Sequence, residues 1–167
     1  MVAVINQDFV VQRFRCESST FYSYLITYPA CNACAIIDPP HPTARCWREI
    51  NDYLHANGAV LSWILHTTVA DTQLEGATAF KLEHVCATSA IGAGSHPDID
   101  CQHFDRLLAH GEPIRLGHGV GRACLPPGAN APQTQYEFDC FQFLGERNEY
   151  FARGWSQDSV RLERNCA

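Results

Sequence analysis

Residues 17-ESSTFYSYLITYPACNACAIIDPP-40 contain the pattern that decides the fold of this chain. Aromatic and β-branched residues over 20–28 and an apolar run over 33–38 predict two strands. Residues 29–32, Pro-Ala-Cys-Asn, predict a tight turn between them. Asp38-Pro39-Pro40 ends the second strand, because proline fixes φ and lacks a backbone donor. The stretch therefore predicts a β-hairpin with an abrupt stop.

The segments around this hairpin alternate between strand and helix patterns. A strand is predicted over 8–15, and two more over 60–65 and 86–91. One helix is predicted from an N-cap at Thr43 to a C-cap at Asn57-Gly58, and a second over 72–85. Strands followed by β-α-β-α-β predict a layered, mixed α/β domain.

The second half of the chain predicts short strands separated by loops. These strands cover residues 114–116, 119–125, 136–144 and 149–152. With 167 residues, the chain is long enough for one domain with its own core. We expect a single domain over residues 1–155 and a polar C-terminal tail over 156–167.

Composition excludes two classes of partner. The formal net charge is −6 and Lys81 is the only lysine, so no basic stripe is predicted for a nucleic acid backbone. No apolar run approaches the ~20 residues that a membrane span requires. We therefore expect neither nucleic acid binding nor a membrane span.

The cysteines indicate a compartment. There are nine, and the start MVAVINQDFVVQRF has no basic segment followed by a long apolar one, as a secretory signal would. An odd number of cysteines without such a signal predicts free thiols in a reducing intracellular compartment. This would be the cytoplasm, or the mitochondrial matrix if a presequence has been removed.

The order of local motifs resembles the metallo-β-lactamase fold, and within it the glyoxalase II and persulfide dioxygenase branch. Residues 17–40 are similar to that branch's opening Ser-Ser-Thr-aromatic-Tyr-Leu strand and Ile-Asp-Pro strand end. Residues 65-LHTTVADTQLEGA-77 are similar to its Thr-His-x-His-Ala-Asp-His-x-x-Gly-Ala loop. Three weaker motifs follow in the family order: 111-GEPIRLG-117, 124-CLPPGANAPQTQYEF-138 and 149-EYFARGW-155.

This resemblance implies an αββα sandwich with mixed sheets. The family core continues for further strands and helices after the last motif, so an incomplete, C-terminally shortened sandwich is expected here. An incomplete sandwich would expose apolar surface, which other protein subunits or a second copy of the chain would cover.

The resemblance also implies a metal site whose ligands are substituted. Family members present His and Asp side chains that hold Zn(II) or Fe(II). An ungapped alignment places non-ligating residues at those positions, and one inserted residue keeps the Ala70-Asp71 pair. On the most generous alignment His66 and Asp71 remain, and two ligands are too few for a stable catalytic centre. The loop positions are His66, Thr68, Ala70, Asp71, Thr72 and Gln73, and the later ones are Ala129, Asn130, Arg153 and Gly154.

Two functions from different classes follow. The first is a catalytically inactive member of the fold, without a metal cofactor, that serves as a structural or accessory subunit. The second is a metal-dependent hydrolase or persulfide dioxygenase acting on a thioester or a glutathione-type thiol. Its Zn or Fe site would be rebuilt from His66, Asp71, His84, Cys101 and His103. A weaker third possibility is a small-molecule-binding module that uses the old cleft without catalysis.

Two local features keep alternative readings. Cys31 and Cys34 form a Cys-x-x-Cys pair that could be redox-active or half of a zinc site, although plain turn cysteines are favoured. His66 and Asp71 could form a general base held by a carboxylate. The favoured interpretation is that Asp71 caps the following helix through the amides of Gln73 and Leu74.

Overall fold

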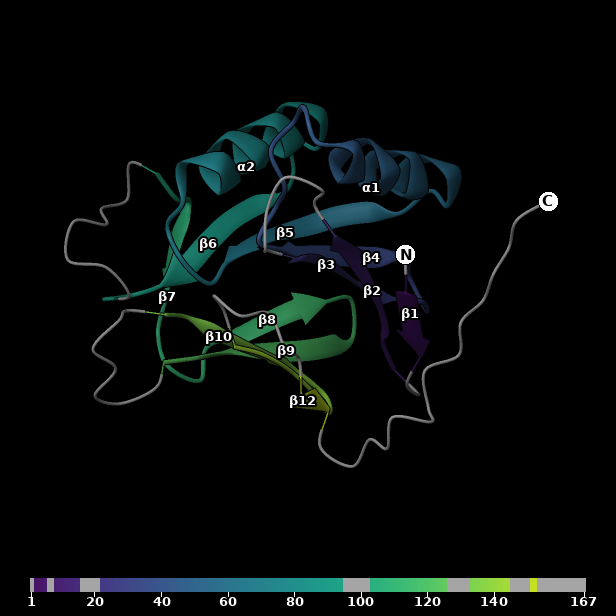
Figure 1. Ribbon diagram of the computed structural model, residues 1–167. Coiled ribbons are helices and arrows are strands. Elements are labelled where there is room, and N and C mark those ends of the chain that lie inside the picture. Colours follow the sequence, from purple (N-terminus) through teal and green to yellow (C-terminus); the bar gives the residue numbers. More distant parts are fainter. Residues whose placement is uncertain are drawn as a thin grey trace.

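The computed structural model describes residues 2–5, 8–15, 22–94, 103–125, 133–144 and 151–152. The described elements form three layers (Figure 1): two helices, a seven-stranded sheet and a five-stranded sheet. Each sheet and helix buries one face against its neighbour, which is how α/β domains build a core. The predicted layered α/β class is therefore confirmed, with the helix layer, first sheet and second sheet stacked in that order.

The larger sheet has the strand order β1-β2-β3-β4-β5-β6-β7. Neighbours from β1 to β4 pair antiparallel, and those from β4 to β7 pair parallel. The predicted hairpin is confirmed as β3 and β4, with Thr27 opposite Cys34. Its strands are β1 (Val2–Ile5), β2 (Val10–Arg15), β3 (Tyr22–Tyr28), β4 (Ala33–Ile37), β5 (Val60–His66), β6 (Thr88–Gly92) and β7 (Arg106–Leu108).

Parallel strands need crossover connections, and the two helices supply them. Helix α1 (Arg45–Ala56) links β4 to β5, and helix α2 (Asp71–Glu83) links β5 to β6. The predicted N-cap at Thr43 is wrong: Ala44 is the N-cap residue, and the Thr43 hydroxyl instead pairs with His41 Nδ1 at 2.8 Å. Neither helix is long and apolar enough to cross a membrane, and no other helix occurs in the described ranges.

The smaller sheet contains β8 (Pro113–Leu116), β9 (Gly119–Cys124), β10 (Gln135–Phe138), β11 (Phe141–Phe143) and β12 (Phe151–Ala152). All its neighbours pair antiparallel. The single strand predicted over 136–144 is wrong, because the chain turns between β10 and β11. Asp139 takes the positive φ of 55° that this turn requires. Strands β1 and β7 were not predicted.

Two apolar cores separate the layers. One lies between the sheets and includes Tyr24, Leu65, Tyr136 and Phe138. The other lies between the larger sheet and the helices and includes Ile50, Leu54 and Phe80. Strands β4 and β5 are covered on both faces, which agrees with their mostly apolar sequences.

Candidate functional site

The candidate site is the loop of residues 67–70, which connects strand β5 to helix α2 and is called the β5–α2 loop below. It lies at the carboxyl end of a central parallel strand (Figure 1). Ligand sites of open α/β sheets form at such strand ends, because the chain leaves the sheet there and opens a crevice. The sequence resemblance points to the same place.

Asp38, the aspartate of the Ile-Asp-Pro strand end, holds the loop from the β4 side. Its carboxylate accepts hydrogen bonds from the Thr67 amide at 2.8 Å and the Thr67 hydroxyl at 2.7 Å. Its own amide donates to Leu65 O at 2.9 Å. Burial raises the pKa of Asp38 to about 6, although the two bonds from Thr67 oppose that rise. Asp38 thus fixes the start of the loop.

The smaller sheet holds the loop from the opposite side. The Tyr136 hydroxyl donates to His66 O at 2.7 Å, and the Thr134 amide donates to Thr67 O at 2.9 Å. The Thr134 hydroxyl accepts from the Gly92 amide at 2.8 Å, which ties in the end of β6. All the bonds that fix the backbone at 66–67 therefore come from protein groups.

The His66 side chain is fully buried inside this arrangement. Its ring meets Phe104 edge to face, with centroids 5.0 Å apart. Burial lowers the pKa of His66 to about 3, and Gln73 opposes that shift. Among the described residues, neither ring nitrogen of His66 nor Oε1 of Gln73 has a partner at hydrogen-bond distance and angle, although the Gln73 side chain is close enough to oppose the pKa shift. His66 is consequently a neutral imidazole at neutral pH. It is a single potential metal ligand, because no group of three His, Cys, Asp or Glu donors among the described residues includes it.

The β5–α2 loop does not assemble a metal-ligand set. In the described part of the chain, one group brings three His, Cys, Asp or Glu donors together, and it consists of His55, Glu83 and His84. His66 and Asp71 are not in it. Threonine, alanine and glutamine are poor substitutes for imidazole toward Zn(II). The described residues of the loop therefore do not fit the metal that the fold family implies.

Asp71 has a different place from the one predicted. It is the first, exposed residue of α2, and the N-cap residue is Ala70. The amides of Gln73 and Leu74 donate to Ala70 O at 2.9 and 3.0 Å, so the predicted capping of these amides by the Asp71 side chain is wrong. Asp71 still carries negative charge in the first helical turn, where the helix dipole favours it.

The remaining predicted site residues are dispersed or outside the described ranges. Thr68 and Ala70 are half-buried in the loop, while His84 follows the far end of α2. His103 lies beside Phe104 at the start of the segment that leads to β7. The residues outside the described ranges are Cys101, Ala129, Asn130, Arg153 and Gly154.

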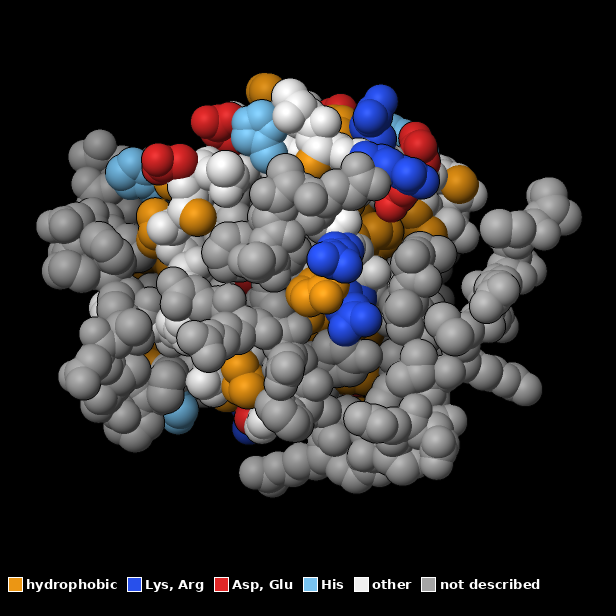
Figure 2. Space-filling view, viewed as in Figure 1, with side chains coloured by type: hydrophobic (Ala, Val, Ile, Leu, Met, Phe, Trp, Pro, Cys, Tyr) orange, Lys and Arg blue, Asp and Glu red, His pale blue; other side chains and the backbone are white. Residues whose placement is uncertain are grey.

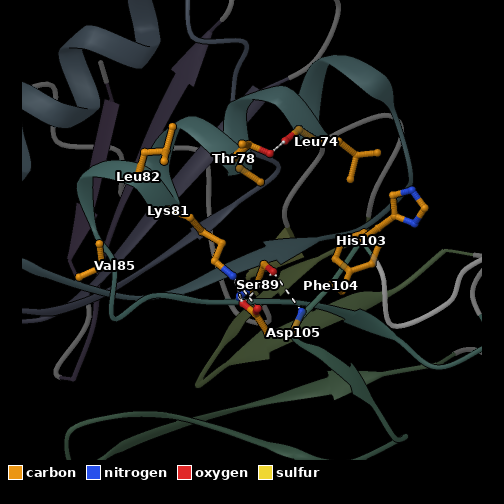
Figure 3. Close-up of a pocket in the computed structure, with 10 residues that line it drawn as sticks. Leu74, Thr78, Lys81, Leu82, Val85, Ser89, His103, Phe104 and Asp105 are labelled. Carbon is orange, nitrogen blue, oxygen red and sulfur yellow. Dashed lines mark hydrogen bonds and ion pairs between the residues drawn. The ribbon is translucent and has the colours of Figure 1, made fainter.

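An open groove runs along α2, beside the loop (Figure 3). It has a volume of about 670 Å³. Lys81 reaches down from the helix to the Asp105 carboxylate, which also accepts bonds from the Ser89 amide and hydroxyl at 2.7 and 2.9 Å. Phe104 lines the groove and contacts His66, which does not line it. The polar side chains Lys81, Ser89 and Asp105 at the base of the groove therefore bond to one another. His66 does not line the groove.

The Cys31–Cys34 pair does not have redox geometry. Cys31 is exposed in the turn and Cys34 is buried in β4, and both thiols are free. Burial raises the pKa of Cys34 to about 11, which is the opposite of what a reactive thiolate needs. The Cys34 sulfur lies 3.2 Å from the Thr27 hydroxyl across the hairpin. The structure thus favours plain turn and core cysteines.

Comparisons with known proteins agree with this architecture. No protein-family model matches the chain. It is 28% identical over 147 residues to a hydroxyacylglutathione hydrolase of Bradyrhizobium sp. (strain ORS 278), an alignment covering 86% of this chain and 53% of that protein. The chain thus spans about half the length of the curated relative that it matches.

Solved structures give the same result. ETHE1 from Myxococcus xanthus superimposes with a TM-score of 0.61 at 18% identity, covering 80% of this chain and 55% of that one. The BLEG-1 B3 metallo-β-lactamase gives 0.62 at 12% identity, covering 80% and 70%. This chain has the metallo-β-lactamase fold. Within that fold, its sequence is similar to hydroxyacylglutathione hydrolase, which is glyoxalase II.

Sequence reasoning missed the residues that fix the loop from a distance. Tyr136 and Thr134 bond to its carbonyls, and Phe104 covers His66. Tyr136 lies in a segment read only as a strand. A tyrosine at an inward-facing strand position was the available signal, because a buried tyrosine hydroxyl needs a hydrogen-bond partner.

Proposed function

We propose that this chain is a catalytically inactive protein of the metallo-β-lactamase fold that acts as a structural or accessory subunit, bound to other protein subunits or to a second copy of itself. The observation that carries the proposal is the β5–α2 loop. Its backbone is held by Asp38, Thr134 and Tyr136. Protein hydrogen bonds hold the loop backbone, and the described residues of the loop assemble no set of metal ligands.

An exposed apolar surface supports the part of the proposal that concerns a partner. Leu82 and Val85, at the end of α2, are 77% and 80% exposed. Both line the groove, as Figure 3 shows. Large apolar side chains with this degree of exposure are typical anchors of protein interfaces when they adjoin a groove. Figure 2 shows mixed charges and histidines over the helix layer, a pattern suited to the polar rim of such an interface.

The first experiment measures hydrolysis of a glutathione thioester and oxidation of glutathione persulfide, with Zn(II) or Fe(II) supplied. We expect no turnover above a buffer control. The matched variants are His66→Ala and Asp71→Asn, which should bind the same amount of metal as the parent chain. Turnover that is lost in these variants would overturn the proposal and establish the rebuilt-site enzyme.

The second experiment tests the partner surface. Sedimentation of the purified chain over a range of concentrations should show self-association, or a stable complex with a defined subunit should form in its place. Leu82→Ser and Val85→Ser should weaken that association at least tenfold. Val120→Ser, an exposed apolar residue of β9, is the control and should leave it unchanged. A monomer at all concentrations, with no subunit whose binding depends on Leu82, would contradict the accessory role.

One observation favours the enzyme as the second candidate. His66 is a neutral imidazole with two bare nitrogens, buried beside the end of β5. If His66→Ala binds less metal than the parent chain, the enzyme is favoured. If it binds the same amount, the inactive subunit is favoured.

A further inference from the structure

The three residues His55, Glu83 and His84 come together at the C-terminal ends of the two helices. His55 lies in the last turn of α1, Glu83 is the last residue of α2, and His84 is the C-cap of α2. One donor atom from each lies within 4.8 Å of the other two. The helices lie side by side on the same face of the sheet (Figure 1), so their ends can present ligands to a common point.

A buried asparagine organises two of the three ligands. Asn51 of α1 is 5% exposed, and its Nδ2 donates to Glu83 Oε2 at 2.8 Å. Asn51 Oδ1 lies 3.1 Å from His84 Nε2. Because an amide oxygen can only accept, the Nε2 nitrogen of His84 must carry the proton. Nδ1 of His84 is then left with a free lone pair, as a metal-binding histidine requires.

The His84 ring is also held from the side. It stacks on Phe80 at 6.3 Å with an interplanar angle of 28°, and its centroid lies 6.0 Å from that of His55. The His84 ring is therefore held in place by Phe80, by His55 and by the Asn51 amide.

The electrostatic setting favours a cation. Two helix C-termini converge, and each carries partial negative charge from its unpaired carbonyl groups. The Glu83 carboxylate adds a formal negative charge, and the two histidines supply imidazole nitrogen donors. Two imidazoles and one carboxylate are a donor set that zinc binds in proteins, and a fourth position stays open for water or another ligand.

From these observations we infer that His55, Glu83 and His84 form a zinc-binding site that joins the C-terminal ends of α1 and α2. Tetrahedral zinc needs its donors about 3.4 Å apart, given zinc–nitrogen distances of about 2.1 Å. His55 and Glu83 are exposed, so rotation of their side chains can close the remaining gap. The site lies at the opposite end of α2 from the β5–α2 loop, roughly 20 Å along a helix of 13 residues.

Zinc at this site would couple the two crossover helices. They come from different parts of the chain, and their shared contacts include the ring pair Trp47–Phe80 at 5.3 Å. A metal that binds only the folded state stabilises that state. The stabilisation grows with the logarithm of the ratio between the metal concentration and the dissociation constant. Zinc binding should accordingly raise the thermal unfolding midpoint of the chain. The inference is independent of whether the protein is an enzyme.

The test is a zinc titration of the purified full chain in competition with a chromophoric chelator. Four chains are compared: the parent, His55→Ala, Glu83→Gln and the control His118→Ala, which replaces an exposed histidine in the β8–β9 turn. We expect one zinc fewer per chain, or at least about tenfold weaker binding, in His55→Ala and Glu83→Gln alone. Zinc should raise the unfolding midpoint of the parent and of His118→Ala but not that of His55→Ala.

Two further measurements locate the bound zinc within the molecule. The nitrogen-15 shifts of the His84 ring should report a protonated Nε2 before zinc is added and zinc on Nδ1 afterwards. His66→Ala should keep the zinc, which separates this site from the β5–α2 loop. Equal zinc affinity in the parent and His55→Ala, or no zinc bound by the parent at equimolar metal, would overturn the inference.

Discussion

The two ends of helix α2 differ in what they offer to a metal ion. The N-terminal end lies in a strand-end crevice and has a loop supported by Asp38, but the described residues there offer a single imidazole. The C-terminal end has no such position in a strand-end crevice, yet it brings together two histidines and a carboxylate with a buried amide behind them. The strand-end crevice and the group of metal-donor side chains thus lie at opposite ends of one helix.

This difference teaches what fixes each region. In the β5–α2 loop, hydrogen bonds between protein groups fix the backbone, so loss of these bonds should be costly and loss of a metal should not. At the helix ends the side chains of His55 and Glu83 are exposed, so their replacement should matter only when zinc is present. Four sets of variants test this contrast, from the largest expected effect to the smallest.

Asp38→Ala should lower the free energy of unfolding by about 3 kcal/mol, because the buried Thr67 amide and hydroxyl lose their acceptor. Asp38→Asn should cost less than about 1 kcal/mol, since its amide group can bond to both and asparagine tolerates the φ of 51° found here. Urea denaturation at neutral pH measures both. Equal losses in the two variants would show that Asp38 does not act through these bonds.

The two buried titrating groups should give opposite pH dependences. The folded pKa of Asp38, about 6, lies above its unfolded value of about 4. Its contribution to the free energy of unfolding is therefore present at low pH and is lost as pH rises from about 4 to about 6. The folded pKa of His66, about 3, lies below its unfolded value of about 6.5. The contribution of His66 to the free energy of unfolding is therefore fully present above about pH 6.5 and is lost as pH falls from about 6.5 to about 3.

Between about pH 4 and 6 the two slopes, each about 1.4 kcal/mol per pH unit, should cancel in the parent chain. His66→Leu should expose the Asp38 slope, so that stability falls by about 2 kcal/mol as pH rises over this interval. Asp38→Asn should expose the His66 slope, and stability should then rise. Urea denaturation at several pH values measures the stability of the parent, His66→Leu and Asp38→Asn. If stability depends on pH in the same way in all three chains, these roles for Asp38 and His66 are wrong.

Tyr136→Phe should cost about 1 to 2 kcal/mol, because the buried carbonyl of His66 loses its donor at 2.7 Å. Tyr28→Phe is the matched control. Its half-buried ring packs on Phe9, so this variant should change stability by less than about 0.5 kcal/mol. Chemical denaturation of the two variants compares them directly. A loss no greater in Tyr136→Phe than in the control would mean that the smaller sheet does not secure the loop.

His55→Ala should have the smallest effect when metal is removed with a chelator. His55 is exposed, so the free energy of unfolding should change by less than about 0.5 kcal/mol. Thermal unfolding with and without chelator gives the comparison. A large loss in metal-free buffer would assign His55 a packing role and weaken the contrast between the two ends of α2.

Local sequence patterns were enough for the layered α/β class, because proline and periodicity act on neighbouring residues. The particular fold was predicted from the resemblance of the Ile-Asp-Pro strand end and the loop after β5 to family motifs, and the sites were predicted only in part. Asp71 was placed at the right helix terminus with the wrong role, since which residue caps depends on backbone angles at Ala70. The turn at Asp139 was missed because residues 136–144 alternate between aromatic and polar side chains, a pattern typical of one continuous strand.

The cluster at the helix ends could not be predicted at all. Glu83 and His84 are neighbours, but His55 is far from them in sequence, and nothing in the local pattern relates the two helices. Asn51 reads as an ordinary polar helix residue, and its role depends on its burial between both helices. Long-range packing therefore determines this site, which a pattern along the chain does not encode.

The hydrogen bond between Tyr136 and His66 joins residues 70 positions apart, and this separation has a consequence for how the chain folds. The β3–β4 hairpin closes over a few residues, so it forms early, whereas closing a long loop has a greater entropic cost and is slow. During synthesis, strand β5 and helix α2 leave the ribosome well before residue 136. The loop at the end of β5 must then wait for the second sheet, and in a pulse-labelling experiment its amides should gain protection after those of the hairpin.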